Sequence, residues 1–143
     1  MAITSAVCNS FKQEILEGEH NFTASTGDTF NLALYDSDAT LSKSTTAYTT
    51  SEELATTGGY TAKGKALTSV TPVLSTDTAI CDFANISWTS ASFTARGCLI
   101  FNDDNSDTSV CAIDFGGDKT VTSGTFTIEF PAAAASTAII AIA

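Results

Sequence analysis

Three neighbouring segments have the sequence pattern of β-strands: FTARGCLIFN at 93–102, SVCAIDF at 109–115 and GTFTIEF at 124–130. In the last segment Phe126, Ile128 and Phe130 alternate with polar residues. Such an alternation is typical of a strand with one buried and one solvent-facing side. Polar residues separate the segments, and the second separation contains a Gly-Gly pair at 116–117, where we expect the chain to reverse. The stretch therefore predicts three antiparallel strands joined by two turns.

The composition favours a single all-β domain. A chain of 143 residues is long enough for one hydrophobic core but short for two. Charged residues make up 15% of the chain, against roughly 25% in typical soluble domains. Threonine and serine replace them, and these residues favour strands and turns. We expect one antiparallel β-sandwich over residues 1–143, Ig-like or jelly-roll, with about eight strands and one short N-terminal helix.

The charge excludes two classes of partner. The net charge is −10, the isoelectric point is about 4.1, and only six residues are Lys or Arg. Nucleic acids and anionic membranes attract clustered cations, so we expect neither as a partner. The chain starts without the basic and long apolar segments of a signal peptide, which predicts synthesis in a cytosol. The apolar end is about half as long as the ~20 residues of a membrane helix, and we expect a final buried strand at 138–143.

Short patterns place the remaining elements. The spacing Ser10-x-x-Gln13 matches a capping box, and Gly18 is a suitable helix end. The apolar side of this predicted helix consists of Phe11, Ile15 and Leu16. Further strands are expected at 28–35, 60–67, 70–74 and 79–88. Trp88 is expected in the core or at the edge of an interface.

The polar segment 36–59 has Leu41, Tyr48 and Leu54 as isolated apolar residues. It is either a partner-binding loop on a rigid scaffold or a solvated connection.

No residue pattern predicts catalysis. His20 is the single histidine, no nucleophile elbow such as G-x-S-x-G occurs, and a lone histidine is most often structural or solvated. The four cysteines lack C-x-x-C spacing, which argues against a zinc site. Cys98 and Cys111 would face each other if the hairpin turned symmetrically. Buried free thiols are the expectation in a reducing cytosol, and a disulfide is the alternative. We therefore expect no enzyme and no cofactor.

The acidic segment 102–107 is the candidate for metal binding. Asp103, Asn105 and Asp107 offer oxygens at alternate positions, as calcium loops do. The segment departs from the EF-hand pattern, since Thr108 stands where glycine is required and Asp114 stands at the position of the bidentate glutamate. The alternatives are a calcium site and a solvated hairpin tip.

A series of motifs resembles a family of small virion proteins of tailed bacteriophages, frequent in environmental and marine phages. The motifs are SFKxExLxGxHxF at 10–22, DTFxLALY at 28–35, GGYTAKGKALT at 58–68, FTARG at 93–97 and DFGGDK at 114–119. The resemblance implies a virion component, assembled in the cytoplasm of the bacterial host, and it implies no catalytic residues.

Within a virion, a small acidic β protein fits a capsid decoration or cement protein that stabilises the head. Its expected partners are the major capsid protein, other virion proteins and further copies of itself. The candidate contact segments are an N-terminal arm within 1–22, the loop 36–59 and the apolar C-terminus. The candidate contact residues are Phe11, Ile15, Leu41, Tyr48, Leu54, Ile140 and Ile142.

Two other functions remain open. One is a tail, neck or fibre-base protein, which would form a ring or trimer. The other is a carbohydrate-binding module, in which exposed aromatic residues would stack on sugars. The aromatic candidates are Tyr35, Tyr48, Tyr60 and Trp88.

Overall fold

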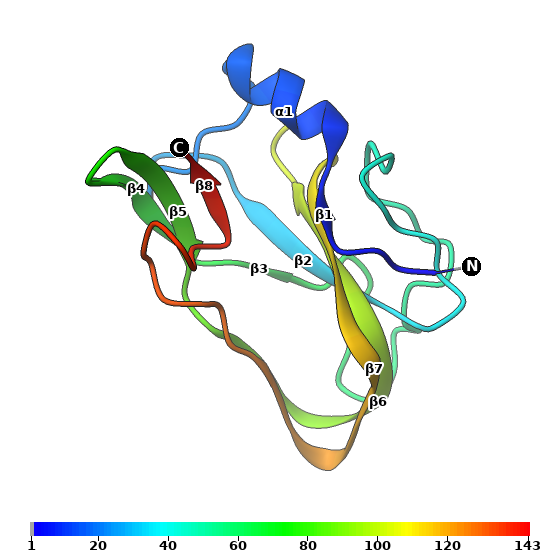
Figure 1. Ribbon diagram of the computed structural model, residues 1–143. Coiled ribbons are helices and arrows are strands. Elements are labelled where there is room, and N and C mark those ends of the chain that lie inside the picture. The colour runs from blue at the N-terminus through cyan, green and yellow to red at the C-terminus, as the bar shows by residue number, and fades with distance from the viewer. Residues whose placement is uncertain (1) are drawn as a thin grey trace.

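The computed structural model describes residues 2–143 and forms two antiparallel β-sheets with one short helix (Figure 1). The strands are β1 (Ala6–Val7), β2 (Phe30–Tyr35), β3 (Lys65–Ala66), β4 (Ser69–Ser75), β5 (Thr78–Phe83), β6 (Ile86–Asn102), β7 (Thr108–Ile128) and β8 (Ile140–Ile142), and the helix is α1 (Asn9–Leu16). One sheet has the order β1-β7-β6-β2-β3 and the other β4-β5-β8. The predicted all-β class, with about eight strands and a single short helix, is confirmed.

The stretch 93–130 forms two long strands instead of three short ones. The second and third predicted segments belong to the same strand, β7, which is 21 residues long. The predicted reversal at Gly116 is therefore wrong. Lys119 pairs with Ala95 and Asp114 with Gly97, so residues 115–118 bulge out opposite a single residue of β6. Gly116 has φ +79°, and a bulge uses this backbone conformation as a turn does, without reversing the chain.

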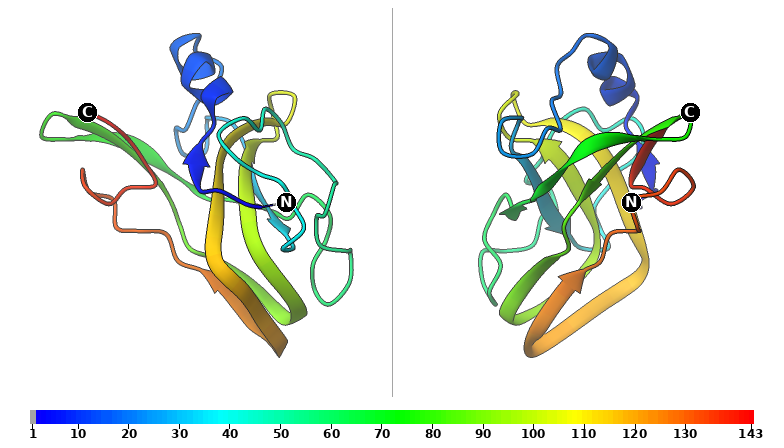
Figure 2. Two further views of the ribbon diagram at one scale, coloured as in Figure 1. Left: turned by 45° about the vertical axis from the view of Figure 1, so that its right-hand side comes forward. Right: turned by 90° about the vertical axis from the view of Figure 1, so that its left-hand side faces the viewer.

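The β6–β7 ribbon reverses its course at a different place. Register shifts occur between Trp88 and Phe93, and the bend contains Ser90 at φ 49° and Ser123 at φ 45°. Figures 1 and 2 show this corner at the lower end of the molecule. It divides β7 into a first limb, residues 108–121, and a second limb, residues 124–128. The two limbs diverge from the corner, and residues of both pack against the main core.

The main core lies between the two sheets. Phe30, Leu32 and Leu34 contribute the predicted inner face of β2 and are fully buried. The rings of Phe22 and Phe30 stack with their centroids 4.2 Å apart. Trp88 is 2% exposed, which confirms its expected place in the core.

Helix α1 lies against this core through Phe11 and ends as predicted, with Gly18 in the left-handed region at φ +76°. The predicted capping box is wrong. The N-cap residue is Cys8, which makes no side-chain cap hydrogen bond, and Ser10 lies inside the first turn. Leu16 is 88% exposed and is not part of the buried side of the helix.

A second core lies on the opposite face of β2. Ala33 and Tyr35 pack there with Leu41, Phe101 and other apolar side chains. The loop 36–59 supplies Leu41, which is fully buried, and Tyr48, which is half-buried. The loop therefore covers one face of the sheet and is not a solvated connection.

Several strand boundaries differ from the predictions. Within 60–67 only Lys65–Ala66 pairs as a strand, and the predicted strand 79–88 is divided between β5 and β6. β8 forms near the C-terminus, but Ile142 is 55% exposed, so this strand is not buried as a whole. No helix within residues 2–143 is long and apolar enough to cross a membrane.

Candidate functional site: the β7 cleft

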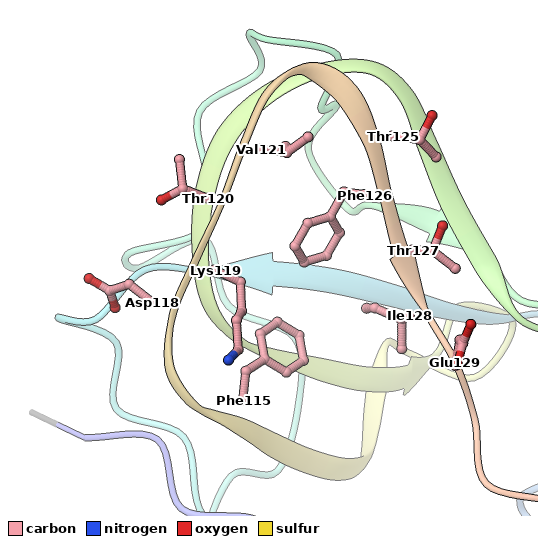
Figure 3. A pocket seen from close by; sticks show the side chains of 10 residues that line it. All are labelled: Phe115, Asp118, Lys119, Thr120, Val121, Thr125, Phe126, Thr127, Ile128 and Glu129. Atoms are coloured by element: carbon pink, nitrogen blue, oxygen red, sulfur yellow. The ribbon is translucent and has the colours of Figure 1, made fainter.

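The two limbs of β7 enclose an open hollow of about 580 Å³, which we call the β7 cleft. Its lining comprises Phe115, Asp118, Lys119, Thr120, Val121, Thr125, Phe126, Thr127, Ile128 and Glu129. Figure 3 shows Phe115, Val121, Phe126 and Ile128 between the limbs, whereas Thr125 and Thr127 point away from them. The alternation of strand residues thus places the apolar side chains inside the cleft and the hydroxyls outside.

The apolar floor of the cleft is anchored to the main core. The ring of Phe126 lies 5.1 Å from that of Phe93, 6.1 Å from that of Trp88 and 6.2 Å from that of Phe115. These centroid distances are in the range of favourable aromatic pairs. Phe126 and Phe115 are only half-buried. One side of each ring therefore packs inward, and the remaining surface is presented to the cleft.

The outer edge of β7 is open along the cleft. β1 pairs with β7 only at Cys111 and Ala112, and the amide of Asp114 donates to Ser5 Oγ at 2.8 Å. Among residues 2–143, no strand pairs with the outer edge from Phe115 to the end of β7. An unpaired strand edge is a surface to which another chain can add.

A charged cluster fixes the bulge at the mouth of the cleft. Arg96 Nε donates to Asp114 Oδ1 at 2.9 Å, and an Arg96 terminal nitrogen lies 3.8 Å from Asp118. The amide of Gly116 donates to the same oxygen of Asp114 at 3.0 Å. The hydrogen bond from Arg96, followed by the one from Gly116, lowers the pKa of Asp114. The cluster holds residues 115–118 of the bulge in one arrangement.

The predicted calcium ligands do not converge on a cation site. Lys63 Nζ lies 3.0 Å from Asp103 Oδ1 and 2.9 Å from Asp107 Oδ2, so an ammonium group occupies the space between the two carboxylates. The side-chain amide of Asn105 donates to Glu19 instead. Hydrogen bonds from Lys63 to Asp107 and then to Asp103 raise the pKa of Lys63. The hairpin tip is therefore held by a lysine, and Lys63 would have to leave the space between these two carboxylates before they could bind calcium.

His20 is structural. It is 7% exposed, and its Nε2 lies 3.2 Å from Glu14 Oε2. The amide nitrogen of Asn102 lies 3.1 Å from His20 Nδ1 and donates to Asp28 Oδ2 at 2.8 Å. Because Asn102 donates to Nδ1, the proton of the imidazole lies on Nε2 and bonds to Glu14. The histidine joins α1 to the β6–β7 hairpin.

The cysteines are buried free thiols. Cys98 pairs with Ile113 and Cys111 with Ile100, so the predicted facing pair is wrong. The hairpin turns around residues 103–107 as expected, but a register shift after Ile100 displaces the strands. All four cysteines are buried and unlinked. Burial raises the pKa of Cys111 to about 12.

Most predicted contact residues are used inside the molecule. Phe11, Leu41 and Ile140 are buried, while Ile15, Tyr48 and Leu54 are half-buried against the two cores. Ile142 alone among the seven has an exposed side chain. In the predicted N-terminal arm, Ile3 is buried in the second core, and Met1 lies outside the described residues.

The carbohydrate-binding prediction is contradicted for three of its four aromatic residues. Tyr35, Tyr60 and Trp88 are at most 2% exposed, so their rings cannot stack on a sugar. Tyr48 is half-buried and stacks on Phe101 with a centroid distance of 4.9 Å.

No family model, curated protein or solved structure matches the chain significantly.

Proposed function

We propose that the protein is a structural component of a bacteriophage virion, a capsid decoration protein bound in many copies to the head. The observation that carries this proposal is the β7 cleft beside the open edge of β7. A half-buried apolar floor next to an unpaired strand edge is suited to contact with another protein chain. The resemblance of the sequence to phage virion proteins supports the choice of particle.

The use of the polar side chains favours binding over catalysis. The histidine bonds to Glu14, and the acidic tip binds Lys63, so these groups are engaged in structural contacts. The cleft itself is lined by apolar, hydroxyl and a few charged side chains. These groups offer surface and hydrogen bonds to a partner without an activated nucleophile among them.

A decoration role fits the charge of the chain. A net charge of −10 favours a partner surface that is neutral or basic. Many copies on one particle add their modest binding energies, which stabilises the assembled shell. The alternative position in the tail or neck would give a single ring.

The copy number in purified particles tests the proposal. Quantitative mass spectrometry of virions from the phage that encodes this chain should find copies in proportion to the major capsid subunits. Absence from the particle would refute the virion role. About a dozen copies or fewer would indicate a single ring in the neck or tail.

A binding assay with matched variants tests the cleft. Ile128→Asp places a charge in the cleft, and Leu16→Asp makes the same kind of change at an exposed leucine on α1. We expect Ile128→Asp to lower the occupancy of capsid shells about tenfold, with Leu16→Asp close to the unmodified protein. Circular dichroism verifies that both variants fold. Equal binding by both variants would exclude the cleft as the contact surface.

A further inference from the structure

The exposed apolar side chains gather on the small sheet. In the described part of the chain, the large hydrophobic residues with exposed side chains are Leu16, Val70, Val73, Leu74 and Ile142. All but Leu16 belong to the sheet β4-β5-β8. Strands β4 and β5 with their turn, residues 69–83, form a hairpin that projects from the molecule, which we call the β4–β5 arm (Figures 1 and 2).

The arm exposes these side chains because it extends past the end of the core. Leu74 pairs with Ala79, and Ala79 pairs with Ile142, so the three side chains share one face of the sheet. Two positions closer to the core, the same face carries Cys81 and Ile140, which are buried. Leu74 is 72% exposed and Ile142 55%. The inner face of the sheet thus continues beyond the part that this chain covers.

The cleft and the arm are complementary in chemistry. β4 carries no charged residue, and the turn of the arm carries one acidic residue, Asp77. The cleft offers an apolar floor and Lys119, which lies between the limbs in Figure 3, whereas the two acidic lining residues, Asp118 and Glu129, point away from the space between the limbs. Asp118 also lies 3.8 Å from a terminal nitrogen of Arg96. Within residues 2–143, neither Asp77 nor Lys119 forms an ion pair. One apolar projection with a negative tip therefore matches one apolar hollow with a positive side chain.

The arm cannot fill the cleft of its own chain. In all three ribbon views the arm lies at the upper end of the molecule and the corner of β7 at the lower end. A second copy, however, brings an arm to this cleft. Copies with a net charge of −10 repel each other over most of their surfaces. The uncharged strand β4 and an Asp77–Lys119 pair reduce that repulsion at this contact.

We propose that the β7 cleft binds the β4–β5 arm of a second copy of this chain, with Leu74 on the apolar floor and Asp77 beside Lys119. This inference rests on the proposed function and names one partner of its cleft. Side chains carry the contact, because Pro72 and the register shift between Val70 and Val73 interrupt the edge of β4. Since each copy offers one arm and one cleft, the contact is head-to-tail and builds a ring or a chain.

A charge-reversal experiment tests the contact. Sedimentation velocity of the purified protein, from micromolar to several hundred micromolar, should reveal association of the unmodified chain. Asp77→Lys and Lys119→Asp each place like charges at the contact, and each should weaken association at least about tenfold. An equimolar mixture of the two variants restores opposite charges at every contact. The mixture should therefore associate as the unmodified protein does.

A second pair of variants tests the apolar part. Leu74→Ser should weaken association, while Leu16→Ser, the same change at another exposed leucine, should leave it unchanged. All these side chains are exposed in the single chain, and circular dichroism verifies the fold of each variant.

Each contrary result overturns the inference: a monomer at every concentration, unchanged association of Asp77→Lys, Lys119→Asp or Leu74→Ser, or no restoration in the mixture. These outcomes are separate from the test of the virion role. A monomeric protein that is abundant in virions would overturn the inference and leave the proposed function. A protein that associates but is absent from virions would refute the proposed function and leave the contact between copies standing.

Discussion

Replacing Glu53 by alanine is expected to destabilise the protein by about 3 kcal/mol, because this carboxylate fastens the loop 36–59 to the sheet. Its Oε2 accepts from the hydroxyl of Tyr48 at 2.5 Å. Its Oε1 accepts from the hydroxyl of Tyr60 and from the backbone amide of Lys63, both at 2.7 Å. The same Tyr60 hydroxyl accepts the amide of Leu34 in β2 at 3.0 Å. Glu53 thus bonds to Tyr48 within the loop and to Tyr60 and Lys63 after it, and Tyr60 connects this group to β2.

The magnitude follows from these three bonds. Hydrogen bonds to a charged group contribute about 1.5–3 kcal/mol each, and removal of the acceptor leaves the donors without it. At the lower end of this range the three bonds sum to about 4.5 kcal/mol. Glu53 is half-buried, so water replaces part of these bonds, and the expected loss of stability is about 3 kcal/mol. Glu53→Gln keeps one carbonyl acceptor and removes the charge. It should cost about 1 kcal/mol.

Urea unfolding followed by tryptophan fluorescence measures these changes, since the single tryptophan lies in the core. Glu52→Ala is the matched control, because Glu52 is adjacent, exposed and makes no side-chain hydrogen bond among residues 2–143. Its carboxylate lies near those of Asp36 and Asp38, so its removal also relieves repulsion. If Glu53→Ala unfolds within about 0.5 kcal/mol of Glu52→Ala, the loop is not fastened by this carboxylate.

Three further predictions concern backbone, thiols and pH. Gly64→Ala should lower the free energy of unfolding by more than about 2 kcal/mol, because its Cβ would meet the carbonyl oxygen of Leu32 in β2. Gly116→Ala, also at positive φ but in open space, should lower it by about 1 kcal/mol. Equal unfolding midpoints of the two variants would contradict the clash. The four buried cysteines should react with Ellman's reagent only after unfolding, and rapid labelling of the folded protein would contradict their burial. The stability of the fold should decrease above pH 10. Burial, followed by the hydrogen bond to Glu53, raises the pKa of Tyr48 from 10.0 to about 12, and hydrogen bonds to Asp107 and Asp103 raise the pKa of Lys63. The folded state therefore favours the protonated forms of both groups, and this stabilisation is lost as they deprotonate. Melting temperatures measured against pH test this, and a Tyr48 that titrates normally in the folded protein, seen by ultraviolet absorbance, would refute it.

Large apolar residues at alternate positions predicted the buried face of strand β2. The alternation of Phe30, Leu32 and Leu34 identified β2 and its inner face correctly. The same alternation could not predict the second core, because Ala33 and Tyr35 are buried by a polar loop that is distant in sequence. A threonine-rich segment gives no periodic signal, although its few apolar residues determine where it packs.

The Gly-Gly pair at 116–117 shows why sequence alone could not distinguish a hairpin turn from a bulge. Gly116 requires a positive φ, and both a hairpin turn and a bulge provide one. What distinguishes them is the partner strand, which here runs on past the glycines to Phe93 and pairs it with Val121. Because the reversal was placed at the glycines, the long ribbon and its corner were not predicted. The cleft depends on that corner and was missed for the same reason, although the alternation of Phe126 and Ile128 was recognised.

Two of the six cationic side chains form ion pairs within the chain. Lys63 and Arg96 are each bound to carboxylates of the same chain, so they compensate acidic groups at fixed places on the molecule. Lys119, like Lys12, Lys43 and Lys65, forms no ion pair within residues 2–143, and it is the one of these four that lines the cleft. A positive side chain that remains free in an acidic protein attracts an acidic partner, and the turn of the β4–β5 arm is such a partner. The arm thus combines exposed apolar side chains with an acidic turn, and the cleft combines an apolar floor with Lys119, so that burial of apolar surface and charge attraction favour the same contact.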